Sequence, residues 1–239
     1  MLKIRIVRRD INPAKIKPIY IMNQPGLSAI DKTAVLEGAR ELIRLADVNG
    51  IEIADFGAWQ NNVYRTPDGS LREFQSAEWY INRGRANSRN SGQLNADALQ
   101  IALLTEPWRD PRKGGKDHYD IFIVHSDMYS QNTNFVIGLA QEGIGTTIST
   151  HRFQGLEDRT RFECIKTETI HELGHVFGLV PNERTTYIEY SLGKHCTNRC
   201  IMRQGLRLPT DWINFTNDRQ RYGALCPTCS KDLREYFRK

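Results

Sequence analysis

The most constraining feature of this sequence is the stretch HELGHVFG at residues 171–178. On a helix, two histidines four residues apart lie about 40° apart around the axis, so His171 and His175 can direct ring nitrogens at one cation. Glu172 lies beside His171, where it can accept a proton from a water on that cation. Gly178 can take positive φ without steric cost, so the chain can leave the helix sharply and turn back toward the metal.

The flanking residues favour a buried helix over an ordinary surface helix. Apolar residues recur at helical spacing on one side of it: Ile165, Ile170, Leu173, Val176 and Phe177. The two histidines and Glu172 fall on the other side, and a metal supplies a reason for that buried polarity. Thr160 and Glu163 have the spacing of a capping box, so we expect the helix to run from about residue 160 to 177, with Gly178 as its stop.

The order of the expected elements is that of an α/β protein. Alternating patterns predict strands at 1–8, 18–23, 51–56, 119–125, 135–140 and 144–150, and further helices at 28–47, 94–105 and near 230–237. Helices that follow strands in this way pack on a mixed, twisted sheet. We expect one α/β subdomain at 1–178, ending in the helix of the motif, and a small loop-rich subdomain at 179–239.

Four of the five cysteines cluster late in the chain, as Cys196, Cys200, Cys226 and Cys229. Two close pairs can each form half of a tetrahedral four-cysteine zinc site, which stabilises a segment with little core of its own. A competing interpretation of the Cys-Pro-x-Cys at 226–229 is a glutaredoxin-like redox motif. We favour zinc because a second cysteine pair is available upstream. Cys164 is expected to be a plain buried thiol.

Composition excludes several classes of protein. No stretch of the 239 residues approaches the length of apolar sequence that spans a membrane, and MLKIRIVRRD lacks the apolar core of a signal peptide, so we expect a cytoplasmic location. The net charge is a mild +5. The densest basic stretches, 83–89 and 109–116, are expected to be exposed loops. Aromatic residues are not interleaved with them, so nucleic-acid binding is the least favoured function.

Taken together, these motifs resemble the archaemetzincins, a branch of the metzincin clan of zinc peptidases. The family pattern is H-E-x-x-H-x-x-G-x-x-H-C, a second cysteine, one residue, a methionine and a later C-x-x-C. Residues 171–178 match its first part directly. The remaining matches come in order: His195-Cys196, Cys200, Met202, Cys226 and Cys229. Residues 134–153 also resemble the family's segment before the zinc helix. The resemblance is strong over about residues 118–229 and weak in the N-terminal half.

The resemblance implies a metzincin-like fold with two zinc ions per chain. His171, His175 and His195 would hold a catalytic zinc, and the four cysteines a structural zinc. Met202 would form the Met-turn beneath the catalytic metal, although an ordinary core methionine would be buried in much the same way. The implied activity is hydrolysis of peptide bonds by a metal-activated water with Glu172 as general base, including aminopeptidase-like action on small peptides. The strand at 144–150 would be the sheet edge that binds extended substrate.

One departure from the family pattern concerns the third ligand. The family's third histidine follows the glycine by three residues, and here that position is Pro181, which cannot bind zinc. His195 comes fourteen residues later, after the insert 181–194. We expect a loop that leaves after Val180 and returns at Lys194, so that His195 takes the third-ligand place. The alternatives are a carboxylate ligand from Glu183 or Glu189, and a site with only two protein ligands.

A second function class stays open at this point. If the insert blocks the cleft or the third ligand is missing, the protein would be a non-catalytic, zinc-stabilised module that binds a peptide. Glu172 discriminates between the two, because a pure binder has no need of a general base. In either case we expect a peptide or protein partner, no membrane and a monomer.

Overall fold

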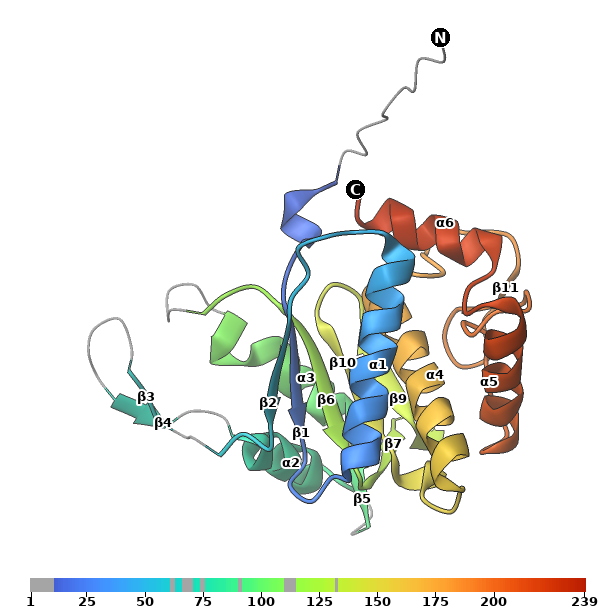
Figure 1. Ribbon diagram of the computed structural model, residues 1–239. Coiled ribbons are helices and arrows are strands. Elements are labelled where there is room, and N and C mark those ends of the chain that lie inside the picture. The colour runs from blue at the N-terminus through green and yellow to red at the C-terminus, as the bar shows by residue number, and fades with distance from the viewer. Residues whose placement is uncertain are drawn as a thin grey trace.

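The computed structural model describes residues 11–60, 63–65, 71–73, 76–89, 92–109, 115–131 and 133–239, so the strand expected at 1–8 lies outside it. A five-stranded sheet forms the centre, in the order β2-β1-β6-β10-β9 (Figure 1). Its strands are β1 (Ile19–Asn23), β2 (Ile53–Gly57), β6 (Tyr119–Val124), β9 (Gly138–Gln141) and β10 (Gly145–Ser149). Only β9 among them runs antiparallel to its neighbour. The expectation of a mixed α/β sheet is therefore confirmed.

Alternation along the central strands supplies a core on each face of the sheet. Successive side chains of a strand point to opposite faces. In β6, Ile121 and Ile123 join the larger cluster of buried apolar side chains, whereas Phe122 and Val124 join a second cluster. Every residue of β6 is buried, because helices cover both faces of the sheet.

Helices α1 (Ala29–Ala46) and α4 (Asp158–Val176) lie side by side on the face of the larger cluster (Figure 1). They approach closely because α1 carries Gly38 at the crossing, where a Cβ would lie 2.7 Å from the Cβ of Thr169. Helix α5 (Thr210–Tyr222) packs on α4, and α6 (Pro227–Tyr236) contacts α1. Helices α2 (Ala77–Ala86) and α3 (Ala96–Thr105) cover the other face and surround the second cluster.

The remaining elements are short. A three-stranded sheet contains β5 (Gln93–Asn95), β7 (Asp127–Ser130) and β8 (Thr133–Val136). Two hairpins pair β3 (Val63–Arg65) with β4 (Leu71–Glu73) and β11 (Ile188–Glu189) with β12 (His195–Cys196). Single 3-10 turns cover Pro13–Lys15, Pro107–Arg109 and His151–Phe153.

The structure corrects three expectations about these elements. The strand expected at 144–150 exists as β10, but it lies between β6 and β9, so β9 is the edge of the sheet. Helices α2 and α5 were not expected, and α5 gives the segment after Gly178 more regular structure than a loop-rich subdomain. The basic stretches are not simply exposed loops, because Arg83 and Arg85 belong to α2 and the side chain of Arg109 is only 10% exposed.

The two proposed subdomains, 1–178 and 179–239, share one apolar core. The larger cluster contains Ile121 and Leu173 from the first segment, and Ile201, Trp212 and Leu233 from the second. Among the described residues, no helix has the length and apolar character needed to cross a membrane.

Candidate functional site

Helix α4 carries the motif, and both of its ends are fixed by local contacts. At the start, the carboxylate of Glu157 accepts hydrogen bonds from the backbone N–H groups of Arg159 and Thr160, at 3.2 and 3.3 Å. The expected capping box is therefore wrong, and Glu163 instead forms an ion pair with Arg219. At the end, the φ of Gly178 is +64°, which turns the chain out of the helix as the sequence predicted.

Three histidines meet at the C-terminal half of α4. His171 and His175 lie on successive turns of the helix, and His195 comes from β12. Their ring centroids are 4.9 Å apart for His171–His175, 5.3 Å for His171–His195 and 5.1 Å for His175–His195. One nitrogen from each ring lies within 4.8 Å of those of the other two. Such a cluster could hold one cation on three imidazoles.

The insert brings His195 to this position by forming a hairpin. Strand β11 pairs antiparallel with β12, with Glu189 opposite His195. Tyr187, which precedes the hairpin, has a left-handed backbone with φ of +55°. Of the two alternative carboxylates, Glu183 is exposed, and Glu189 lies near His195 but accepts a hydrogen bond from the backbone of Gln204 at 3.4 Å. Neither belongs to the histidine cluster among the described residues.

The chemistry of the three rings fits a divalent cation. Burial, and then the positive charge that His195 would carry, lower the pKa of His171 to about 3. The pKa values of His175 and His195 are also lowered, chiefly by burial. Nδ1 of His171 lies 2.7 Å from the carbonyl oxygen of Ile201. A carbonyl can only accept, so Nδ1 carries the hydrogen and the lone pair of Nε2 is free. Neutral, oriented imidazoles are the form that binds zinc.

Glu172 is buried beside the histidine cluster. One of its carboxylate oxygens lies 4.0 Å from Nε2 of His171. The side chain packs directly against Gly138 of the edge strand β9. Burial, and then the neighbouring Glu168, raise the pKa of Glu172, while a hydrogen bond with Thr146 of β10 lowers it. The carboxyl group therefore lies between the metal-binding face of α4 and the sheet edge.

Sequence reasoning missed Glu168, which is completely buried one turn before Glu172. The indole Nε1 of Trp212 on α5 donates a hydrogen bond of 2.6 Å to the Glu168 carboxylate. Burial outweighs that bond and raises the pKa of Glu168 to about 8. The signal was present as a glutamate four residues before Glu172 on the same face of a helix, but the partner Trp212 lies on a helix that was not expected.

Met202 is fully buried and packs against α4. Its carbonyl accepts a hydrogen bond of 2.8 Å from the backbone N–H of Cys196. Its sulfur fills the space next to Gly174, where a Cβ would lie only 2.7 Å away. The absence of a side chain at Gly174 lets Met202 pack directly on α4.

The four late cysteines form a second cluster next to the first. All four are buried thiols without disulfide bonds, and their sulfur atoms lie within 4.8 Å of one another. The sulfurs of Cys196 and Cys226 are 3.8 Å apart. Tetrahedral zinc with Zn–S bonds of about 2.3 Å sets neighbouring sulfurs about 3.8 Å apart, so the thiols fit zinc. The two clusters are joined through β12, because His195 and Cys196 are adjacent residues of that strand.

A third group of titratable side chains lies at the start of the central strand β6. Nε2 of His118 is 2.7 Å from Glu106 and 3.2 Å from Asp120, and Arg109 forms an ion pair with Asp120. Nδ1 of His118 lies 2.6 Å from the carbonyl of Lys116. Two cations and two carboxylates balance, so the group is a closed ion-pair network. His118 is fully buried within this network.

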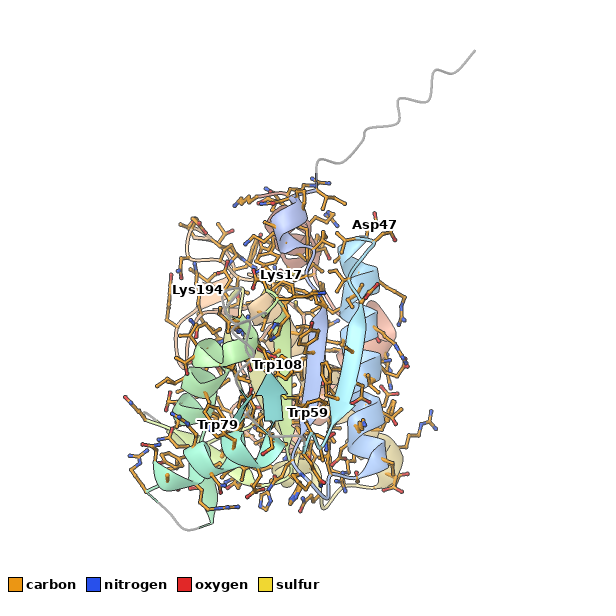
Figure 2. All side chains as sticks on the ribbon, turned by 90° about the vertical axis from the view of Figure 1, so that its left-hand side faces the viewer. Lys17, Asp47, Trp59, Trp79, Trp108 and Lys194 are labelled. Atoms are coloured by element: carbon orange, nitrogen blue, oxygen red, sulfur yellow. The ribbon has the colours of Figure 1, made fainter. Side chains whose placement is uncertain are left out.

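Aromatic rings cover the same network. Tyr20 stacks on His118, with ring centroids 4.3 Å apart. Phe56 contacts Tyr20 and Trp59, and Trp59 contacts Trp108 at 6.0 Å. Figure 2 shows Trp59 and Trp108 beside each other on the side of the molecule that carries β2. This packing keeps water from the ion pairs.

Solved structures of known proteins share this fold. The crystal structure of archaemetzincin from Methanopyrus kandleri aligns with a TM-score of 0.60 and 19% identity, over 94% of this chain and 97% of that one. Archaemetzincin from Archaeoglobus fulgidus, solved in complex with malonate, aligns with a TM-score of 0.52 and 18% identity, over 90% and 99%. At these identities the likeness concerns the fold: a mixed α/β protein of the class that these archaemetzincin structures define.

Curated relatives show a likeness to archaemetzincins in sequence as well. Archaemetzincin from Nanoarchaeum equitans is 40% identical over 88 residues, which are 37% of this chain and 40% of the relative. Archaemetzincin from Haloarcula marismortui is 26% identical over 163 residues, covering 64% and 84%. The stronger match thus spans less than half of its relative's length. No family model matches the chain. The chain is thus similar to archaemetzincins in part of its sequence and in its fold, which agrees with the resemblance that its motifs indicated.

Proposed function

We propose that this protein is a zinc metallopeptidase, with His171, His175 and His195 as ligands of a catalytic zinc and Glu172 as the general base. The observation that carries the proposal is the convergence of three neutral imidazoles, two buried and one half-buried, beside a buried carboxyl group. A module that only binds peptide would have no use for that carboxyl group. The likeness to archaemetzincins supports the same activity.

The chain's own residues have separate roles in this proposal. Zinc bound to the three imidazoles would supply a Lewis acid that polarises the scissile carbonyl and lowers the pKa of water. Glu172 would take the proton of the attacking water and pass it to the leaving amine. The Ile201 carbonyl would orient the His171 ring through its hydrogen bond to Nδ1. Met202 would support α4 from below by packing, without binding the metal.

The edge strand β9 is the proposed substrate strand. One side of β9 pairs with β10, and its other side is free of strand partners in the described sheet. A peptide could add there as a further strand, held by backbone hydrogen bonds. Gly138 of β9 touches Glu172, so a peptide on this edge would pass close to the general base. This assignment replaces β10, which is an interior strand.

The four-cysteine cluster is proposed to hold a second, structural zinc. Reduced cysteines gathered in this way are typical of the reducing cytoplasm, which we propose as the location. Small peptides, cleaved from the amino end by a monomeric enzyme, are the proposed first substrates.

The test compares wild type with Glu172→Gln and, as a matched control, Glu189→Gln. We expect wild type and Glu189→Gln to cleave members of a peptide mixture, and Glu172→Gln to lose about 100-fold or more in rate while keeping its zinc. Mass spectrometry of the products reads out cleavage and its position. Equal cleavage by Glu172→Gln, or no cleavage by a fully zinc-loaded wild type, would overturn the proposal in favour of the peptide-binding module.

A further inference from the structure

One arginine of the insert 181–194, Arg184, contacts the four-cysteine cluster. Arg184 is only 8% exposed, although it lies in a loop. All five of its N–H donors have acceptors. Nε donates to the carbonyl of Thr186 (2.9 Å), Nη1 to Sγ of Cys229 (3.2 Å) and to Asp232 (2.9 Å), and Nη2 to the carbonyl of Tyr187 (3.1 Å) and to Sγ of Cys196 (3.1 Å). A guanidinium offers five donors in a fixed plane, so this site uses its full capacity.

A lysine at the end of the insert closes the loop around that arginine. Nζ of Lys194 donates to the carbonyls of Pro181, Asn182 and Arg184, at 2.5, 2.9 and 2.6 Å. An ammonium has three donors, and all three bind the first turn of the insert. The beginning and the end of the insert are therefore tied together immediately before His195. This geometry belongs to an anchored loop rather than to a lid.

Charge explains why an arginine is needed at this position. Four thiolates around one Zn²⁺ leave a net charge of −2, and buried charge is costly unless it is paired and hydrogen-bonded. Asp232 adds another negative charge next to Cys229, and it also accepts the backbone N–H of Val180 at 3.2 Å. The guanidinium pairs with this carboxylate and donates to two of the four sulfurs. Without it, the thiolates and Asp232 would face one another uncompensated.

We propose that Arg184 is a positioning residue of the four-cysteine zinc site, which it stabilises by hydrogen bonds to the Cys196 and Cys229 thiolates. The insert is then a component of that site and fixes the position of β12, from which both Cys196 and His195 arise. The inference rests on the proposed structural zinc and is independent of peptidase activity.

Cobalt substitution tests the inference on the full-length protein. Cobalt on thiolates gives an intense charge-transfer absorption that a three-histidine site lacks, so this band reports the four-cysteine site alone. The variants are Arg184→Met and Arg184→Lys, with Arg207→Met as control because the Arg207 side chain is 78% exposed. Cobalt and zinc affinities are measured by competition with a chelator, and folding is checked by circular dichroism.

We expect Arg184→Met to bind the metal about 10- to 100-fold more weakly than wild type. Its charge-transfer band should move to longer wavelength, because thiolates that lose hydrogen bonds give up electrons more easily. Arg184→Lys, which keeps the charge without the planar fork, should fall between the two. Arg207→Met should match wild type.

A second variant separates this role from simple pairing with Asp232. If Arg184 only neutralises Asp232, the double variant Arg184→Met/Asp232→Asn should regain wild-type affinity and band position, and the inference would be wrong. Unchanged affinity and band position in Arg184→Met would also overturn it. Absence of the thiolate band in wild type would instead refute the structural zinc site itself. If Arg184→Met does not fold, Arg184→Lys provides the same comparison.

Discussion

Gly138 of the edge strand lies in direct contact with the carboxyl group of Glu172: a Cβ at residue 138 would be 2.4 Å from the carboxyl carbon. No side chain can occupy this space unless Glu172, the proposed general base, moves. The close packing of the sheet edge on the face of α4 that carries Glu172 therefore depends on the absence of a side chain at residue 138.

The first prediction follows from this contact. Gly138→Ala should displace the Glu172 carboxyl group and lower kcat about 100-fold, because a general base misplaced by about 1 Å loses much of its effect. Its zinc content should equal that of wild type. Gly155→Ala is the control, because a Cβ there meets no atom within 4 Å. The measurement is steady-state kinetics on a peptide that wild type cleaves. Full kcat in Gly138→Ala would contradict the prediction.

The second prediction concerns the packing of Met202 under α4. Gly174→Ala should destabilise the fold by about 1–3 kcal/mol, because the new methyl group would meet the Met202 sulfur at 2.7 Å. Urea unfolding with zinc in excess measures the change. Combining it with Met202→Val, which shortens the opposing side chain, should recover part of the loss. A double variant no more stable than Gly174→Ala would show that the strain lies elsewhere.

The third prediction concerns the buried pair of Trp212 and Glu168. Trp212→Phe removes the indole N–H that donates a hydrogen bond of 2.6 Å to the Glu168 carboxylate. The buried carboxylate then lacks this indole donor. We expect a loss of about 1–3 kcal/mol in the free energy of unfolding. Trp79→Phe, at a partly exposed position on α2, controls for the change of ring. A double-mutant cycle with Glu168→Leu should reveal coupling. Independent, additive effects would argue that the bond contributes nothing.

The fourth prediction is a loss of stability at alkaline pH. Burial alone would lower the pKa of His118, but hydrogen bonds to Asp120 and Glu106 outweigh it and raise the pKa to about 9. A group whose pKa is raised on folding stabilises the protein fully at pH values below its unfolded-state pKa, which is about 6.5 for histidine. This stabilisation is lost as the pH rises through the folded-state pKa. Wild type should therefore exceed His118→Gln in stability by up to about 3 kcal/mol at pH 6, with the difference vanishing by about pH 10.

Thermal unfolding at each pH checks this prediction. Arg109, Tyr80 and Tyr20 also face the network, through an ion pair with Asp120, a hydrogen bond to Glu106 and a ring stacked on His118. They are present in both proteins, so the difference between wild type and His118→Gln isolates the histidine. A constant difference between pH 6 and pH 10 would refute the assignment.

Elements with strong periodicity could be predicted from the sequence, whereas helices α2 and α5 could not. The buried positions of α2 (77, 80, 81 and 84) and of α5 (212, 215, 216 and 219) have the same helical spacing. However, Gly84, Thr216 and Arg219 occupy some of them, and these residues do not look like a core. Arg219 is buried because Glu41 and Glu163, on α1 and α4, supply its partners. Such pairing exists only in the folded protein.

The candidate site was predicted residue by residue, but its surroundings were not. Local spacing indicates that His171, Glu172 and His175 share one helix face. The order of β9 and β10 across the sheet depends on which strand pairs with β6, and the sequence carries no local signal for that choice. For the same reason, the contact of Gly138 with Glu172 and the Trp212 hydrogen bond to Glu168 could not be foreseen.

The tie between Lys194 and the start of the insert has a consequence for the evolution of such sites. Because the two ends of the insert are held together, the number of residues between Val180 and His195 need not alter where the imidazole lies. A metal site of this kind tolerates a longer chain between its ligands, provided that hydrogen bonds within the added segment hold its two ends together. Relatives that vary in this loop would then escape any search that demands a fixed interval between histidines.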